Sequence, residues 1–197
     1  MVIALIFLAA YLIGSIPTGL IIGKVFYHKD IRQHGSGNLG ATNTFRILGK
    51  KAGIFVTIFD VLKGTISALF PFFLHQDIHP ILVGLAAVIG HVYPIYLKFK
   101  GGKAVATSAG VILGTNPVLF LIIAVIFFTL LFSTKMVSLT SILTSIANFI
   151  GSLFFDDKVF MAISFVIMIV IIVRHRSNIE RIMNGTESKV NFNKNTK

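Results

Sequence analysis

The chain has 197 residues, of which 55% are hydrophobic, 13% are charged and none is cysteine. Soluble domains carry about 25% charged residues, so this composition argues against a soluble enzyme and excludes a disordered chain. Without cysteine, the protein has no disulfide, no cysteine nucleophile and no thiolate metal site.

Long apolar segments recur along the whole chain and predict an all-α integral membrane protein with seven transmembrane helices. The first contains Met1–Ile22, which lacks a basic leader and an A-x-A cleavage pattern, so we expect a membrane span rather than a signal peptide. The predicted spans are residues 3–24, 52–74, 79–98, 104–115, 117–133, 137–155 and 158–174.

The fourth segment, residues 104–115, is too short to cross a bilayer unless it is tilted or re-entrant, and the sequence leaves this open. Asn116-Pro117 ends it, because proline disfavours helix in the residue before it. We expect residues 1–187 to form a single polytopic membrane domain and residues 188–197 to form a flexible cytoplasmic tail.

The net charge is +11, and 16 of the 18 lysines and arginines fall on one side of the predicted seven-span topology. Such an excess of Lys and Arg marks the cytoplasmic side of a membrane protein. The pattern predicts an N-terminus outside and a C-terminus in the cytoplasm. It also explains the positive charge without a nucleic-acid partner.

A glycine-rich cytoplasmic segment, residues 32–53, contains more glycines and small polar residues than a membrane-topology signal requires. It holds five glycines, two asparagines and four cations. Glycines allow turns whose successive backbone N–H groups bind anions, and Arg46 can add a bidentate contact to a phosphate. The alternative is an ordinary flexible loop.

A second candidate for phosphate binding is Gly101-Gly102-Lys103, which leads directly into an apolar helix. A glycine-rich turn at a helix start presents backbone N–H groups and the positive end of the helix dipole. The Walker A pattern fails at Leu97 and Ala104, so nucleotide hydrolysis is not implied. The alternative is a basic anchor at the membrane surface.

A third polar segment, residues 174–182, lies at the cytoplasmic end of the last predicted span. Arg174, His175 and Asn178 share one interfacial turn there. His175 is the group whose charge changes closest to neutral pH. The alternative is a positively charged stop-transfer cap.

A few polar residues lie inside or at the edge of predicted spans. Asp60 and Lys63 stand three apart on one helix face, and they either pair as structural residues or line a polar site. His91 either lines the site or bonds a neighbouring helix. Ser138, at the start of the sixth span, is either a helix N-cap or a site residue.

Two glycine-rich cationic segments on one side of the membrane suit a reaction between a phosphorylated soluble molecule and a lipid that carries a phosphate. The acidic residues Asp30, Glu180 and Glu187 are scattered, so we expect no metal site and no cofactor. Neither a G-x-S-x-G elbow nor a His-x4-Asp pair is present. The chemistry must therefore use a good leaving group or the substrate's own base.

Four segments carry a family resemblance: GSGNLGATNTFR, GHVYPIYLKFKGGKAVAT, VSLTSI at residues 137–142, and RHRSNIERI. In order and spacing they resemble the signature segments of the bacterial acyl-phosphate:glycerol-3-phosphate acyltransferases, the PlsY family, over residues 10–183. GSIP at Gly14–Pro17 fits as well. The family pattern has a glycine after the lysine of the Gly-Gly-Lys turn. Here Ala104 stands, which a helix start should tolerate.

The resemblance implies a multi-pass enzyme of the bacterial cytoplasmic membrane with its active site on the cytoplasmic side. It implies acyl transfer from acyl phosphate to the 1-hydroxyl of sn-glycerol 3-phosphate, which gives lysophosphatidate and phosphate, the first step of phospholipid synthesis. It implies catalytic roles for Ser36, Arg46, Lys103 and His175, and substrate-binding roles for Asn38, Gly40, Thr42, Asn43, Gly101, Gly102, Ser138 and Asn178. His91, Asp60 and Lys63 are expected to support the site.

The sequence leaves several points open. The proton of the attacking hydroxyl goes either to His175 or to a phosphate oxygen of the donor, and family likeness favours the second. We expect a monomer in the lipid bilayer, with an oligomer left open, and the acyl-chain preference is not given. The rival functions are a secondary transporter of a small phosphorylated anion and a non-catalytic lipid-binding or scaffolding protein.

Overall fold

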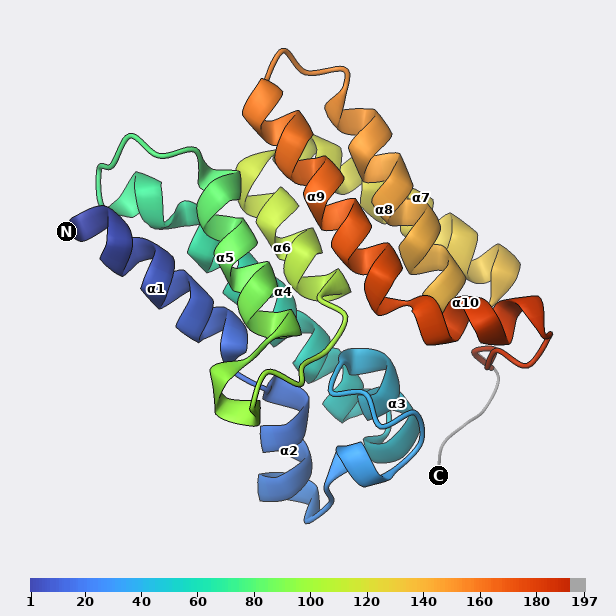
Figure 1. Cartoon of the computed structure of the whole chain (residues 1–197). Helices are drawn as coiled ribbons and strands as arrows, with labels where there is room; N and C mark the ends of the chain where they lie inside the picture. The colour runs from blue at the N-terminus through green and yellow to red at the C-terminus, as the bar shows by residue number, and fades with distance from the viewer. Residues whose placement is uncertain (192–197) are drawn as a thin grey trace. The chain divides into compact units, whose positions relative to one another are not determined.

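The computed structural model describes residues 1–191, and every regular element in that range is helical (Figure 1). The chain divides into two compact units, Met1–Thr115 and the part that begins at Asn116. The single domain expected over residues 1–187 would include both units and stays a prediction. Residues 192–197 of the predicted tail lie outside the described range.

Each predicted apolar segment contains helix, and two further α-helices and one 3-10 helix lie in the polar segments between or after them. The first unit contains α1 (Val2–Ser15), α2 (Thr18–Tyr27), the 3-10 helix η1 (Ile31–Gln33), α3 (Ala41–Leu48), α4 (Lys50–Phe73), α5 (Pro80–Val92), the 3-10 helix η2 (Ile95–Leu97) and α6 (Val105–Thr115). The second contains α7 (Pro117–Thr134), α8 (Val137–Ser152), α9 (Lys158–Arg174) and α10 (Arg176–Met183).

By length and apolar composition, the described residues contain between three and five candidate membrane spans. Three segments qualify alone: Lys50–Phe73, Pro80–Leu97 and Pro117–Thr134. Two bent pairs, α1 with α2 and α9 with α10, qualify if each pair is one span. Helices α6 and α8 are apolar but shorter. The described residues thus have the all-helical architecture of a membrane protein.

The first predicted span, residues 3–24, is wrong as a single helix, because the chain breaks at Ile16-Pro17. Helices α1 and α2 meet there at an angle of 44°. Pro17 cannot donate a backbone hydrogen bond and forces the preceding residue out of helix, so Ile16 is extended with ψ of 116°. The break takes the carbonyl of Ile16 out of the helical hydrogen-bond pattern and exposes it to side chains.

Within the first unit, α4 packs along α6, and α1 packs along α5 (Figure 1). Glycines permit the close approach of α4 and α6. A β-carbon at Gly64 would collide with the carbonyl oxygen of Thr107, and one at Gly110 would collide with that of Val61. Small residues at such crossings are how membrane helices pack without a hydrophobic driving force between them.

In the second unit, α8 packs between α7 and α9. Phe149 of α8 and Phe165 of α9 hold their rings 5.2 Å apart. Large apolar side chains of α7 remain exposed, among them Leu121, Val125 and Phe128. An apolar helix with so exposed a surface is typical of a helix that faces lipid.

Candidate active site

The first polar segment, which was predicted to form anion-binding turns, folds into η1, a tight turn and helix α3. Its hub is the side chain of Asn43, which is 1% exposed. The amide nitrogen of Asn43 donates to the carbonyl oxygens of Ile31 (2.9 Å) and His34 (3.1 Å). Its amide oxygen accepts from the backbone N–H of Ser36 at 3.0 Å. Asn43 therefore fixes the turn that carries Ser36.

An acidic residue anchors the start of this segment. Asp30 accepts hydrogen bonds from Arg32, with an Nη2–Oδ2 distance of 2.6 Å, and lies 3.7 Å from the ammonium group of Lys24. The hydrogen bonds from Arg32 hold the pKa of Asp30 well below its ordinary value. The carboxylate is therefore ionised at any physiological pH and keeps η1 in place.

The predicted contact residues lie on the exposed side of this turn. Ser36 and Arg46 are exposed, and the Arg46 side chain passes beside Gly35, whose φ is +61°. The side-chain oxygen of Asn38 accepts from the N–H of Gly40 at 3.1 Å. Thr42 is exposed in the first turn of α3. These groups lie on the exposed side of a backbone turn that the buried side chain of Asn43 fixes.

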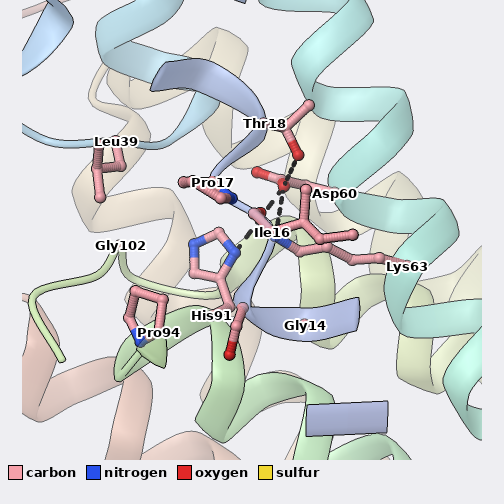
Figure 2. A pocket seen from close by; sticks show the side chains of 11 residues that line it. Gly14, Ile16, Pro17, Thr18, Leu39, Asp60, Lys63, His91, Pro94 and Gly102 are labelled. Carbon is pink, nitrogen blue, oxygen red and sulfur yellow. Dashed lines mark hydrogen bonds and ion pairs between the residues drawn. The ribbon is translucent and has the colours of Figure 1, made fainter. Parts of the chain in front are cut away.

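The structure brings the first polar segment and the Gly-Gly-Lys turn to one place. Leu39 and Gly102 line the same small pocket, together with Thr18, Asp60 and His91 (Figure 2). A buried apolar cluster lies beside it and receives Leu97 of η2. The cluster consists of Leu20, Ile22, Ile31, Leu39, Leu48, Ala52 and Val56. The two segments predicted to bind phosphate are thus neighbours within the first unit.

A buried ion pair forms the floor of this pocket. Lys63 Nζ lies 2.7 Å from Asp60 Oδ1, and both side chains are less than a tenth exposed. The carboxylate also accepts from Thr18 at 3.2 Å, and the ammonium group donates to the carbonyl of Ile16 at 3.2 Å. The pair is therefore structural and lines the pocket, so it combines both sequence-based alternatives. Buried charges require such partners.

His91 contacts a neighbouring helix, as one of its two alternatives predicted, and it also lines the pocket. Its Nδ1 lies 3.0 Å from the hydroxyl of Thr107 on α6 and 3.9 Å from Asp60 Oδ1. Figure 2 shows the ring between Asp60 and the backbone at Gly102. The histidine bonds a neighbouring helix and lines the pocket.

The Gly-Gly-Lys turn differs from its expected form in how its amides are used. The N–H of Gly101 donates to the carbonyl of Val92, and the N–H of Gly102 donates to that of His91, each at 3.1 Å. A β-carbon at Gly102 would collide with His91 Nε2. The two glycines are needed because the backbone passes directly over His91. The groups of this segment that can still bind an anion are Lys103, which is half-buried, and the N–H groups in the first turn of α6.

The sequence indicated that Ala104 is the first residue of a helix, but in the structure it lies just before the helix. Its φ is +55°, in the left-handed region, and α6 begins at Val105. A non-glycine residue there costs about 1–2 kcal/mol because its β-carbon crowds the following carbonyl. A glycine would fit this position better.

In the second unit, the predicted residues Ser138 and Asn178 converge on a carboxylate that the sequence reading had dismissed as scattered. Glu187 Oε1 accepts from Ser138 and from Asn178, and Oε2 accepts from Arg181, all at 2.7 Å. Burial raises the pKa of Glu187, but the hydrogen bonds from these three donors lower it by more than burial raises it. The resulting pKa lies below the ordinary value. Ser138 is not the N-cap of α8, because Met136 holds that position.

His175 lies at the sharp bend of 59° between α9 and α10 and is 3% exposed. Its Nδ1 lies 2.7 Å from the carbonyl oxygen of Ile171. A carbonyl oxygen only accepts, so Nδ1 carries a proton and a neutral ring keeps its lone pair on Nε2. The ring is thus set in the tautomer that can accept a proton at Nε2.

Three polar residues that hold these groups in place were not predicted from the sequence: Thr18, Thr107 and Glu187. Thr18 follows the proline break, which was a usable signal. Nothing local in the sequence pairs Thr107 with His91 or Glu187 with Ser138. Ser138, His175 and Asn178 belong to the second unit, and the other predicted site residues belong to the first.

Comparisons with known proteins agree on one family. The family model for glycerol-3-phosphate acyltransferase matches residues 4–185. A glycerol-3-phosphate acyltransferase of Macrococcus caseolyticus is 73% identical and covers 98% of this chain and 100% of its own. One of Staphylococcus haemolyticus is 54% identical, with coverages of 98% and 100%.

Two crystal structures of PlsY, an integral membrane glycerol 3-phosphate acyltransferase, share the fold. The glycerol 3-phosphate form has a TM-score of 0.90 at 38% identity, and the lysophosphatidic acid form has 0.87 at 37%. Both alignments cover 95% of each chain.

Proposed function

Because the chain belongs to the glycerol-3-phosphate acyltransferase family, we propose that it transfers a fatty acyl group from acyl phosphate to the 1-hydroxyl of sn-glycerol 3-phosphate. The products are 1-acyl-sn-glycerol 3-phosphate and inorganic phosphate, and the reaction opens phospholipid synthesis. The observation that carries this proposal is that two cationic, glycine-rich segments each contribute one residue, Leu39 and Gly102, to the same pocket of the first unit. Both substrates carry a phosphate that such segments suit.

The proposed reaction exchanges one bond for another. The 1-hydroxyl oxygen attacks the carbonyl carbon of the acyl phosphate, and the new ester bond forms as the bond to the phosphate oxygen breaks. The hydroxyl proton ends on phosphate. Because phosphate is already a good leaving group, no general acid is needed, and the main task of the protein is to stabilise negative charge.

In the first unit we assign this task to Lys103 and Arg46. Lys103 holds the acyl phosphate and stabilises the departing phosphate, and Arg46 neutralises the glycerol phosphate. Ser36 and Asn38 contribute polar contacts from the turn that Asn43 fixes. Buried Asp60 and Lys63 form an ion pair with each other, and we assign them a supporting role rather than contact with substrate.

In the second unit we assign substrate contacts to His175, Asn178 and Ser138, as the family resemblance implies. The proton acceptor is a phosphate oxygen of the donor rather than His175. A His175→Asn variant should then keep measurable turnover. Its loss in kcat should be smaller than the contribution of a general base, which is about 10²–10⁴-fold. A larger loss in a variant that keeps its thermal stability would assign the base to His175.

We further propose that the protein acts as a monomer in the bacterial cell membrane. It spans the membrane seven times, with the N-terminus outside and the site on the cytoplasmic side, because the lysines and arginines cluster in the segments that hold the site. Reporter fusions after residues 76, 116 and 156 should report the outside. Cytoplasmic signals there would overturn this orientation.

The product test uses purified protein in detergent with acyl phosphate and glycerol 3-phosphate, without divalent cation or coenzyme A. Mass spectrometry should identify the 1-acyl product, and acyl-CoA or acyl carrier protein should not replace acyl phosphate. A transporter would form no product and would instead move glycerol 3-phosphate into sealed proteoliposomes. That outcome would replace the acyltransferase proposal.

A further inference from the structure

Two neighbouring residues hold the back of the Gly101–Lys103 turn: Val92, whose carbonyl accepts the N–H of Gly101, and His91. The carbonyl oxygen of His91 accepts the N–H of Gly102 at 3.1 Å. Its ring lies so close under the turn that a β-carbon at Gly102 would collide with Nε2. Main chain and side chain of His91 therefore fix the same backbone segment, from which Lys103 extends.

The ring of His91 is itself held on its other edge. Nδ1 contacts the Thr107 hydroxyl at 3.0 Å on α6 and faces Asp60 Oδ1 at 3.9 Å on α4. Three elements thus set one ring orientation. A buried imidazole with partners at defined positions loses little freedom and can transmit its position to the turn.

The network continues to the break in the first helix pair. Asp60 accepts from Thr18, and Lys63 donates to the Ile16 carbonyl that the Pro17 break leaves outside the helix. The side chains of Asp60, Lys63 and His91 are all less than a tenth exposed. The α1–α2 break is therefore linked through buried contacts to the phosphate-binding turn (Figure 2).

We propose that His91 is a positioning residue for the Gly101–Lys103 turn, and that Thr107 and Asp60 set the orientation of its ring. The inference rests on the proposed function in one respect, namely that this turn binds the acyl phosphate. The proposed arrangement of the turn itself can be tested without activity.

The first experiment measures hydrogen–deuterium exchange in the peptide that covers residues 98–108. His91→Phe keeps a ring and the backbone carbonyl that accepts from Gly102, but it loses both ring nitrogens and with them the contact to Thr107. Exchange at residues 101–104 should then rise by about tenfold, the effect of one lost hydrogen bond. The matched control is Thr65→Val, which removes a hydrogen bond from α4 to the Gly110 carbonyl of α6 without touching the turn. Unchanged exchange in His91→Phe, or an equal rise in Thr65→Val, overturns the proposal.

The second experiment separates the two substrates kinetically. His91→Phe should raise KM for acyl phosphate by about tenfold and leave KM for glycerol 3-phosphate within about twofold. Thr107→Val should shift KM in the same direction, whereas Thr107→Ser keeps the hydroxyl and should behave as wild type. An equal rise in both KM values, or a Thr107→Ser variant as impaired as Thr107→Val, assigns His91 a merely structural role.

The two experiments remain decisive if the His91→Phe variant does not fold or if the wild-type protein is inactive. If His91→Phe does not fold, the Thr107 pair decides the question by the same exchange and KM measurements. If wild type forms no product, the proposed function fails while the exchange result still tests the arrangement of the turn.

Discussion

The hydroxyl of Ser138 donates to the carboxylate of Glu187 over 2.7 Å, although the two residues are 49 positions apart in the chain. The same carboxylate accepts from Asn178 and Arg181. Glu187 thereby ties the start of α8 to α10 and to the segment that follows it. A second tie is the backbone hydrogen bond from Val190 to Lys135 at 2.7 Å.

Replacement of Glu187 should destabilise the protein. In Glu187→Ala, the buried donors of Ser138 and Asn178 lose their acceptor, at a cost of about 1–3 kcal/mol for each unsatisfied group. Thermal unfolding in detergent measures the loss. The matched control is Glu180→Ala, because Glu180 is exposed and should change the Tm little. A Glu187→Ala protein as stable as this control would contradict the assigned role.

The contribution of Glu187 should depend on pH in a defined direction. Burial raises the pKa of Glu187, but its hydrogen bonds lower it more, so the folded pKa lies below the ordinary value of 4.5. A carboxylate of this kind stabilises the fold above its unfolded pKa, and the contribution is lost as pH falls through the folded pKa. The Tm difference between wild type and Glu187→Gln should be largest above about pH 5 and shrink in acid. A difference that grows in acid would refute this.

Glycine at position 104 should stabilise the protein. The left-handed φ of +55° at Ala104 costs about 1–2 kcal/mol in a residue with a β-carbon. Ala104→Gly removes this strain, although the freer unfolded chain offsets part of the gain. Differential scanning calorimetry should show a higher Tm. Ala109→Gly, inside α6, is the opposing control and should cost about 1 kcal/mol. A lower Tm in Ala104→Gly would contradict the argument.

The two proposed site cations of the first unit should be needed for turnover rather than for stability. Lys103→Ala and Arg46→Ala should each lose at least about 10²-fold in kcat/KM, the usual effect of removing a group that stabilises developing negative charge. Steady-state phosphate release measures this. Lys100→Ala and Lys51→Ala, at exposed neighbouring positions, are the controls. Near wild-type rates in both site variants would remove these residues from the site.

The sequence predicted the apolar helices well because their ends coincide with strong local signals. Pro117 starts α7, and Asp157 caps α9 by accepting from the N–H of Phe160. The break at Pro17 was missed because the residues on either side are apolar enough to read as one span. Helix α3 was missed because a glycine-rich segment reads as a loop, whereas tertiary packing of Leu48 and the hydrogen bonds of Asn43 favour helix.

The site residues named from the sequence stay a prediction, and the contacts that hold them could not be predicted. Glycine-rich, cationic segments are visible in the sequence, and the structure places two of them at one pocket. The use of the Gly101 and Gly102 amides inside the protein could not be predicted, because it depends on where the carbonyls of Val92 and His91 point after α5 ends. The same holds for Glu187, whose donors come from distant parts of the chain.

The most direct test of acyl transfer is the initial rate of phosphate release from acyl phosphate by the purified wild-type protein, measured with and without glycerol 3-phosphate. An acyltransferase should release phosphate only when glycerol 3-phosphate is present, with a rate that saturates as glycerol 3-phosphate increases, in the absence of added divalent cation. Release at the same rate without glycerol 3-phosphate would show simple hydrolysis and contradict acyl transfer.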